Sequence, residues 1–377
     1  MSAALRGVLL IDKPKGFTSH DVVARVRRLF KTKEVGHAGT LDPMAEGLLV
    51  ILLGEATKLS PYITADDKSY VAQMDFGYST DTLDTEGEVT FRSESMDLNQ
   101  TAITEAAQKL VGDLRLPVPI YSAVKLHGRK LYEYARSGQE VDIPIRTMRF
   151  YSSEVVEVSP KSLKVKLACE KGAYIRAWVG QLGEDLGVGA TMTALVRQSS
   201  GPFDLSQSIS LEALTKLAEE KGVSLIHRKE SQPPQPTQIP AAPLSSRIQT
   251  LMTPPSQTQE TRKAAPLASQ PRESVTDQAL EAFLDEVQKS SYFIPIEQCL
   301  SGRFYRLDSF EERLMKNGQI AHSLEKRLVP QVHEVLRTQK DQLIRIFTHK
   351  TGEGDKLKAL ITIRHDQPRP KLLRVFN

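Results

Sequence analysis

One stretch of the sequence combines residue types and spacing that could do chemistry. Residues 36–47 read GHAGTLDPMAEG, and an apolar run, residues 48–53, follows them. Three glycines and a proline in this stretch indicate a sharply turning loop, and the apolar run is typical of a buried strand. Asp42 would then stand on a rigid support, with His37 upstream of it, and could act as a nucleophile or as an acid or base. Asp-Pro pairs in loops also commonly form Asx turns, so this stretch alone leaves both interpretations open.

Two predicted strands carry further candidate residues. Val71, Gln73 and Asp75 stand at alternate positions of a predicted strand, and Tyr70 begins this strand, where its ring could equally well lie in a core. Residues 163–169 have an apolar side chain at every second position, which is the pattern of a strand with one buried face. The segment after this second strand contains Tyr174 and Arg176.

Residues 121–138 mix cationic and aromatic side chains. Lys125, Arg129 and Lys130 are interleaved here with tyrosines. Such a mixture suits a surface that neutralises phosphates and stacks bases. This segment is therefore a candidate nucleic-acid contact.

The elements that must support the Asp42 loop begin near the N-terminus. Residues 7–12 are predicted to form a short strand, and residues 13–16 form the turn that ends it. Thr18 or Ser19 caps a helix whose apolar residues recur at helical spacing, with most of its cations on the other side. That basic face is more often simply solvated, but it lies directly before the loop.

Composition bounds the class of protein. The chain has 377 residues, of which 40% are hydrophobic and 25% charged, as in ordinary globular proteins of two or three units. A net charge of +4 permits a polyanionic partner without requiring one. Cys169 and Cys299 form no CxxC pattern, which argues against a disulfide framework and fits a reducing cytoplasm. The apolar run at residues 8–11 is too short for a signal peptide or a membrane span, so we expect a cytoplasmic protein.

No cofactor is indicated by the sequence. Its eight histidines form no HxxxH or HExxH pair, and it contains no Walker A or dinucleotide-binding glycine pattern. We therefore expect neither a metal nor a nucleotide cofactor.

The loop at residues 36–43 resembles the signature of the TruB family of pseudouridine synthases, enzymes that isomerise a uridine in the TΨC loop of tRNA. In that family the Asp of this signature is the catalytic nucleophile, a role that the resemblance assigns to Asp42. The turn with Lys13 and Pro14 is similar to a family pattern that packs beneath the active site, which implies a structural role. A Lys-x-Tyr motif of the family places the ring of Tyr70 against the target base, where stacking offsets the cost of leaving the RNA stack.

Two later motifs extend the resemblance. The segment ending in Tyr174 and Arg176 is similar to the family's Cys-x-Lys-Gly-Thr-Tyr-Ile-Arg, with Ala173 in place of Thr. There the Arg pairs with the catalytic Asp and the Tyr lines the uracil pocket; a guanidinium would hold the carboxylate in one orientation. A later Leu-x-Arg-x-x-x-Gly-x-Phe motif places Leu195 against the flipped base. We also assign His37 to substrate binding.

The cationic segment, within about residues 120–150, looks like the family's inserted loop that grips the tRNA arm. This assigns substrate contacts to Lys125, Arg129 and Lys130. The family usually has Gln-x-Pro-Pro before this loop, whereas this chain has Leu116 and Val118 with their prolines, which puts an RNA contact at the Gln position in doubt.

Domain organisation follows from a change in composition. Residues 231–271 hold nine of the 21 prolines, seven glutamines, and no glycine or aromatic residue, so we expect a disordered linker at residues 229–276. Residues 1–228 would form the catalytic domain, an α+β fold around a mixed, mostly antiparallel sheet. Residues 277–377 resemble the small β-rich, PUA-like RNA-binding domain of bacterial members.

The resemblance implies a tRNA pseudouridine-55 synthase. Asp42 would assist cleavage of the N-glycosidic bond, and the uracil would rotate while other pocket residues hold it, before C5 rejoins the ribose. We expect the TΨC arm of tRNA as partner, no obligatory protein partner and a monomer. Two alternatives stay open: a non-catalytic RNA-binding or tRNA-folding protein, which would not need the pair of Asp42 and Arg176, and a guide-dependent pseudouridine synthase.

Overall fold

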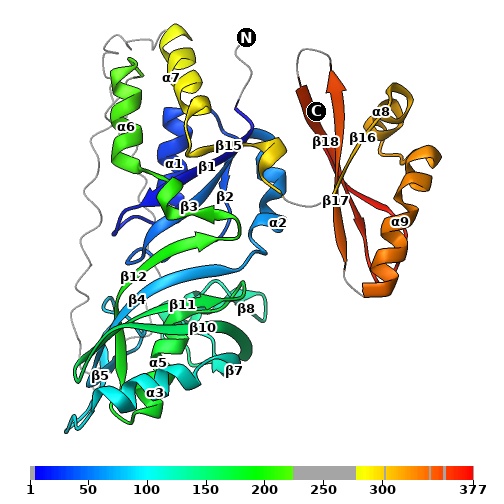
Figure 1. The fold of residues 1–377 in the computed structure, drawn as a ribbon. Coiled ribbons are helices and arrows are strands. Elements are labelled where there is room, and N and C mark those ends of the chain that lie inside the picture. Colours follow the sequence, from blue (N-terminus) through cyan, green and yellow to red (C-terminus); the bar gives the residue numbers. More distant parts are fainter. Residues whose placement is uncertain (1–4, 224–276, 301–302, 339–340, 351–353, 377) are drawn as a thin grey trace, which may run out of the picture.

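A large mixed sheet forms the body of the protein (Figure 1). The computed structural model describes residues 5–223, 277–300, 303–338, 341–350 and 354–376. The sheet has 11 strands, with the central order β14-β1-β3-β12-β4-β11-β10-β7. All its pairings are antiparallel except β1 with β14 and β3 with β12, which confirms the expected mixed, mostly antiparallel sheet. Its strands are β1 (Gly7–Lys13), β2 (Val35–His37), β3 (Glu46–Leu53), β4 (Lys68–Phe76), β7 (Gly112–Pro117), β10 (Ile145–Ser159), β11 (Ser162–Cys169), β12 (Ala190–Ser200), β13 (Phe203–Asp204), β14 (Ile209–Ser210) and β15 (Phe293–Pro295).

Strand β3 is buried on both faces. Leu49 and Ile51 belong to the main core of the large unit, whereas Leu48 and Val50 face a second apolar cluster. A strand covered on both sides reads as a continuous apolar run, which is why its sequence does not alternate. The loop that carries Asp42 leads directly into this strand and so has a rigid base.

Helices cover the sheet at two ends. Helices α1 (Ser19–Leu29), α6 (Leu211–Glu220) and α7 (Asp277–Lys289) lie together near β1 (Figure 1). Helix α1 begins at a capping box in which Thr18 and Asp21 bond each other's backbone, as the sequence predicted for its start. Helices α3 (Gln100–Lys109) and α5 (Ile175–Asp185) lie at the other end, beside β10 and β12.

Several short helices and two hairpins lie outside the large sheet. They are η1 (Gly54–Leu59), α2 (Ser60–Ile63), α4 (Leu131–Ser137), η2 (Leu205–Gln207) and η3 (Ile296–Gln298), with two hairpins made of β5 (Tyr78–Thr80) and β6 (Val89–Arg92), and of β8 (Lys125–Leu126) and β9 (Arg129–Lys130).

The C-terminal unit is a 4-stranded sheet with the order β16-β17-β18-β19, shown in orange and red in Figure 1. Its strands are β16 (Phe304–Arg306), β17 (Gln342–Lys350), β18 (Gly354–Ile363) and β19 (Lys371–Val375), and its helices are α8 (Ser309–Lys316) and α9 (His322–Thr338). The helices pack on one face of this sheet. From the other face, Leu360 and the neighbouring Phe376 reach the apolar cluster beneath β3, and Lys58 Nζ donates to the carbonyl of Val375 at 3.3 Å.

The expected domain limits differ from this arrangement at one point. The proposed linker, residues 229–276, lies outside the described residues. The sequence places residues 277–298 in the C-terminal domain, yet helix α7 and strand β15 of this segment pack on the large unit: the rings of Phe283 and Phe30 lie 5.1 Å apart, and β15 pairs with β1. This packing depends on long-range apolar contacts that composition alone cannot assign. Within the described ranges, no helix is long and apolar enough to cross a membrane.

Candidate active site

The loop between β2 and β3 is fastened by side chains from the N-terminal elements. Ser19, which is 1% exposed, donates its hydroxyl to the carbonyl of Leu41 at 3.1 Å and accepts the amide of the same residue at 2.9 Å. The carbonyl of Pro43 accepts the amide of Gly16 at 2.8 Å and Lys13 Nζ at 3.4 Å. Bonds on both sides thus hold Asp42, whose side chain remains 40% exposed.

A buried guanidinium faces this carboxylate. Nη2 of Arg176, in the first turn of α5, lies 3.0 Å from Oδ2 of Asp42. The same side chain, 5% exposed, donates to the carbonyls of Thr82 and Tyr121, each at 3.0 Å. Since a planar guanidinium with several fixed acceptors cannot rotate freely, it holds the Asp42 carboxylate in one orientation.

A second carboxylate shares this guanidinium, and sequence reasoning missed it. Oδ2 of Asp84 lies 3.7 Å from Nε of Arg176, and Asp84 is 3% exposed. Its Oδ1 accepts the hydroxyl of Thr82 at 2.6 Å and the amide of Glu86 at 3.0 Å. In the sequence these residues form a polar turn, and no spacing signal relates them to Asp42 or Arg176.

Most predicted site residues line one pocket of about 450 Å³. Tyr70, from β4, is 8% exposed, and burial raises the pKa of its phenol, so the hydroxyl stays protonated at neutral pH. The lining includes five predicted residues, namely Asp42, Tyr70, Tyr174, Arg176 and Leu195.

His37 is not brought into this pocket. Its ring lies edge-on against the ring of His20, with 5.4 Å between the centroids. Burial, together with the neighbouring charges of His20 and Arg197, lowers the pKa of His37, which favours a neutral imidazole. His37 is the last residue of β2, and the pocket lining begins two residues later, at Gly39.

The three loop cations lie on the β8–β9 hairpin, outside the pocket lining. Arg129 stacks over the ring of Tyr134, with 4.5 Å from the guanidinium carbon to the ring centroid. Lys130 lies 5.3 Å from the ring centroid of Tyr132, a residue that does line the pocket, and Lys125 is exposed. The hairpin thus presents cations next to the pocket, while Tyr132 and Tyr134 belong to α4, where Tyr134 is buried.

Two further basic residues line the pocket and were not assigned a role from sequence. Lys68 donates Nζ to the carbonyl of Thr64 at 2.8 Å, and burial lowers the pKa of its ammonium. Arg197 is 1% exposed and reaches the carbonyls of Gly39 and Leu48. The signal that could have found Arg197 is its place in the Leu-x-Arg motif.

The departures from the family motifs have visible locations. Ala173 lines the pocket, where its methyl group offers no hydroxyl for a hydrogen bond. Leu116 and Val118 are 2% and 1% exposed and belong to the main core, so their apolar side chains are used for packing.

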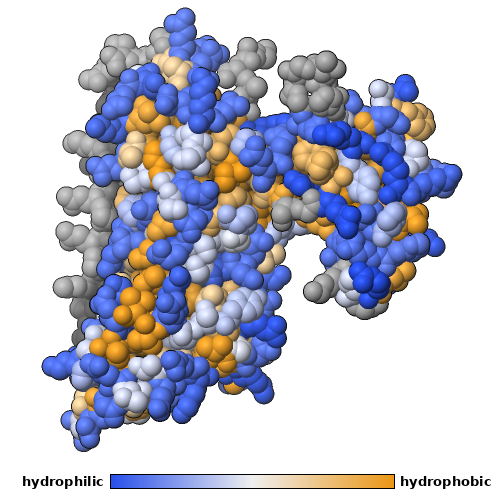
Figure 2. All heavy atoms as spheres, in the orientation of Figure 1, coloured by the Kyte–Doolittle hydropathy of each residue, from blue (hydrophilic) through white to orange (hydrophobic). Residues whose placement is uncertain are grey.

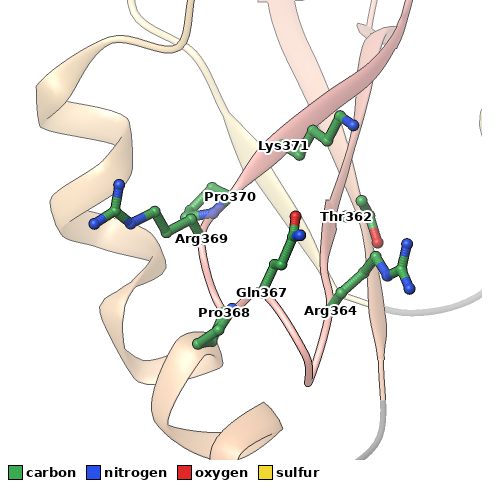
Figure 3. A pocket seen from close by; sticks show the side chains of 7 residues that line it. All are labelled: Thr362, Arg364, Gln367, Pro368, Arg369, Pro370 and Lys371. Carbon is green, nitrogen blue, oxygen red and sulfur yellow. The ribbon is translucent and has the colours of Figure 1, made fainter.

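A second pocket of about 500 Å³ lies at the turn between β18 and β19 (Figure 3). Its lining includes Arg364, Arg369 and Lys371, and Arg364 bridges Asp366 at 2.8 Å. Arg369 extends toward a helix, while Arg364 extends to the other side of the hairpin (Figure 3). In the described part of the chain, no group of three or more His, Cys, Asp or Glu side chains is arranged to hold a metal ion.

Comparison with known proteins defines the class first. A solved structure described as a Cbf5-Nop10-Gar1 complex contains a chain of the same fold, with a TM-score of 0.59 over 99% of this chain and 85% of that chain, at 20% identity. A family model described as "TruB family pseudouridylate synthase (N terminal domain)" matches residues 27–175, which include the Asp42 loop and Tyr70. The fold and the sequence of the Asp42 loop together are those of a pseudouridylate synthase.

Curated relatives make the assignment more specific. A tRNA pseudouridine synthase B of Bdellovibrio bacteriovorus is 49% identical over 219 residues, which are 58% of this chain and 70% of the relative. A tRNA pseudouridine synthase B of Caldicellulosiruptor saccharolyticus is 47% identical over 212 residues, or 56% of this chain and 73% of the relative. This chain belongs to the TruB family of pseudouridylate synthases.

Proposed function

We propose that this chain isomerises uridine to pseudouridine in the TΨC loop of tRNA, with Asp42 as the catalytic carboxylate. The observation that carries this proposal is the 3.0 Å contact between Asp42 and the buried guanidinium of Arg176, inside a pocket that also holds Tyr70, Tyr174 and Leu195. The curated relatives named tRNA pseudouridine synthase B support tRNA as the substrate.

The pocket suits a single extruded base. Its volume of about 450 Å³ falls in the range of small-molecule sites, roughly 300–1,000 Å³. A flipped uridine loses a few kcal/mol of stacking, which the aromatic face of Tyr70 offsets. Tyr174 and Leu195 supply further walls, so that the uracil stays confined while it turns.

The reaction rearranges bonds without a net gain or loss of atoms. Asp42 assists cleavage of the bond between C1′ of the ribose and N1 of the uracil. After the ring has rotated, C5 bonds to C1′, the proton on C5 leaves, and N1 becomes protonated. Arg176 holds the carboxylate toward the sugar throughout, and the neutral hydroxyl of Tyr70 is available for proton transfer at the base.

The tRNA arm would be held outside the pocket. Lys125, Arg129 and Lys130 on the β8–β9 hairpin bind phosphates, and the neighbouring Tyr132 of α4 offers a ring on which a base can stack. His37, which is outside the pocket lining, is proposed to contribute to substrate binding.

The C-terminal unit is proposed as a PUA-like RNA-binding module. In support, its visible face is largely hydrophilic (Figure 2), and its β18–β19 turn carries the cations Arg364, Arg369 and Lys371. We propose a catalytic domain at residues 1–228 extended by residues 277–298, a linker at residues 229–276, and this module after residue 303. The enzyme would act as a monomer in the cytoplasm.

A guide-dependent synthase is the second candidate, because the Cbf5 structure described above is of a complex with Nop10 and Gar1. Relatives 47% and 49% identical that are named as tRNA enzymes favour the stand-alone activity. The test is to incubate the purified full chain with an unmodified tRNA transcript and to map pseudouridine chemically. A transcript with cytidine at the target position is the matched control.

Turnover without guide RNA or partner protein supports the proposal. Absence of product with this transcript, together with intact tRNA binding, would instead favour a non-catalytic RNA-binding protein.

A further inference from the structure

Arg197 occupies a central position in the sheet. It belongs to the Leu-x-Arg motif, but neither the motif nor the proposed reaction assigns it a role. It lies on β12, where it is the register partner of Tyr70 on β4 and of Gly47 on β3. Side chains directly opposite each other on antiparallel strands share one face, with Cβ atoms about 5 Å apart. Arg197 therefore stands between the residue that faces the base and the end of the Asp42 loop.

The guanidinium connects the two ends of the Asp42 loop. Nε donates to the carbonyl of Leu48 at 2.7 Å, and Nη2 donates to the carbonyl of Gly39 at 3.2 Å. These two carbonyls flank Asp42 on its two sides. On the neighbouring strand, Tyr70 is paired directly with Arg197, and both side chains line the pocket, where the positive charge of Arg197 opposes the rise that burial causes in the pKa of the phenol. One rigid, planar group thus bonds to both ends of the catalytic loop and lies opposite Tyr70.

Two glycines of the loop, Gly39 and Gly47, lie in close contact with Arg197. A Cβ on Gly47, whose φ is +93°, would lie 2.5 Å from the carbonyl oxygen of Arg197, and a Cβ on Gly39 would lie 3.4 Å from its Nη1. Both glycines have positive φ, which other residues rarely adopt. The loop therefore depends on glycine where it passes the backbone and the guanidinium of Arg197.

The charge of Arg197 argues for a role beyond packing. The side chain is 1% exposed, and among the described residues no carboxylate forms an ion pair with it. A second buried cation, Lys68, is close enough for Arg197 to contribute to the lowering of its pKa. Burying a cation without a carboxylate is costly, and an apolar side chain would fill the same space at lower cost.

We infer that Arg197 is a positioning residue that fixes the hydroxyl of Tyr70 relative to the carboxylate of Asp42. This inference rests on the proposed function, because it assigns the phenol and the carboxylate to one reaction. Loss of the guanidinium fork removes the group that faces the phenol, whereas Ser19 and Gly16 still hold the Asp42 loop and the surface that binds the tRNA arm is unaffected.

The test is a double-mutant cycle of Arg197→Lys and Tyr70→Phe, read by single-turnover pseudouridine formation. Lysine keeps the positive charge but loses the fork. We expect Arg197→Lys to slow the reaction about 10²-fold, as misplacement by about 1 Å does, with tRNA affinity changed less than about threefold. In the Tyr70→Phe background the same substitution should cost less than about threefold, because the hydroxyl that it positions is already absent.

Thr191→Val is the matched control. Thr191 lies on the same strand, is fully buried and donates to the carbonyl of Tyr78 at 3.0 Å, away from the pocket lining. It should lower thermal stability and leave the single-turnover rate unchanged.

Equal rate losses from Arg197→Lys in the wild-type and Tyr70→Phe backgrounds would overturn the inference, and so would a wild-type rate. If Arg197→Lys fails to fold, Arg197→Gln, which keeps one amide donor, takes its place in the cycle. Failure of both variants to fold would make Arg197 a purely structural residue and refute the inference. A wild-type enzyme that forms no pseudouridine would refute the proposed function instead.

Discussion

Replacing Arg176 tests how two carboxylates share one buried guanidinium. Arg176→Met keeps a long side chain but removes the charge, so Asp84, whose side chain is 4% exposed, loses its cation at 3.7 Å. Breaking a buried pair by removing one partner costs about 3–5 kcal/mol. Asp42 is 40% exposed and adds little, since exposed pairs contribute about 0–1 kcal/mol.

Asp84 also retains its bonds from Thr82 and the amide of Glu86, which favours the lower end of that range. We therefore expect a loss of about 3 kcal/mol in the free energy of unfolding. For a unit of this size, this corresponds to a melting temperature lower by roughly 6–12 °C.

A second substitution separates stability from activity. Asp84→Asn in the Arg176→Met background removes the uncompensated charge and should recover about 1–2 kcal/mol of stability. Pseudouridine formation should remain at least about 10²-fold below wild type, because Asp42 still lacks its orienting cation. The assays are thermal melting followed by circular dichroism and single-turnover product formation.

The reasoning is refuted by either of two results. If the double variant melts no higher than Arg176→Met, then the Asp84 charge is not what destabilises that variant. If the double variant regains near wild-type turnover, then the orientation of Asp42 by Arg176 is not required.

Three further predictions concern the cations of the β8–β9 hairpin, the segment at residues 231–271, and Lys13. Changing Lys125, Arg129 and Lys130 together to Ala should weaken tRNA binding and flatten its salt dependence, measured by filter binding at several salt concentrations; an unaltered slope would place the RNA elsewhere. Deleting residues 231–271 should leave turnover and melting temperature nearly unchanged, because their composition cannot support a core; a large loss of either would contradict this. Burial lowers the pKa of Lys13 from 10.5 to about 8. Between these two pH values the unfolded chain therefore binds more protons at Lys13 than the folded chain does. The wild type should then gain stability relative to Lys13→Met as the pH rises from about 8 to 10.5. A difference in melting temperature between the two proteins that falls over this range would contradict the prediction.

The local sequence pattern was sufficient to predict the helix and strands near the Asp42 loop. The unbroken apolar run of β3 predicted a buried strand, and the structure shows that its two faces reach different apolar clusters. The capping residues before α1 predicted where that helix begins. The alternating positions along β4 predicted a strand beginning at Tyr70, and the structure has a strand there whose side chains alternate in burial.

Long-range partners could not be predicted in the same way. Asp84 meets Arg176 because β12 and α5 bring distant segments together, and no spacing in the sequence encodes that meeting. The ring of His37 lies against that of His20 on α1. The pairing of β2 with β3 determines which way this side chain points, and the loop sequence alone does not reveal that pairing. Helix α7 joins the large unit because its apolar face, with Phe283, fits against α1. Such contacts depend on topology, which a single sequence does not specify.

The central claim is that Asp42 does chemistry, and Asp42→Asn tests it most directly. Asn has nearly the size of Asp and can form the same turn hydrogen bonds, so a loop that only needs a cap would be little disturbed. The measurement pairs tRNA affinity by filter binding with single-turnover pseudouridine formation. We predict intact folding and affinity with a rate loss well beyond about 10³-fold, more than positioning alone explains. Product formed at a near wild-type rate would contradict the account and leave Asp42 as a turn residue.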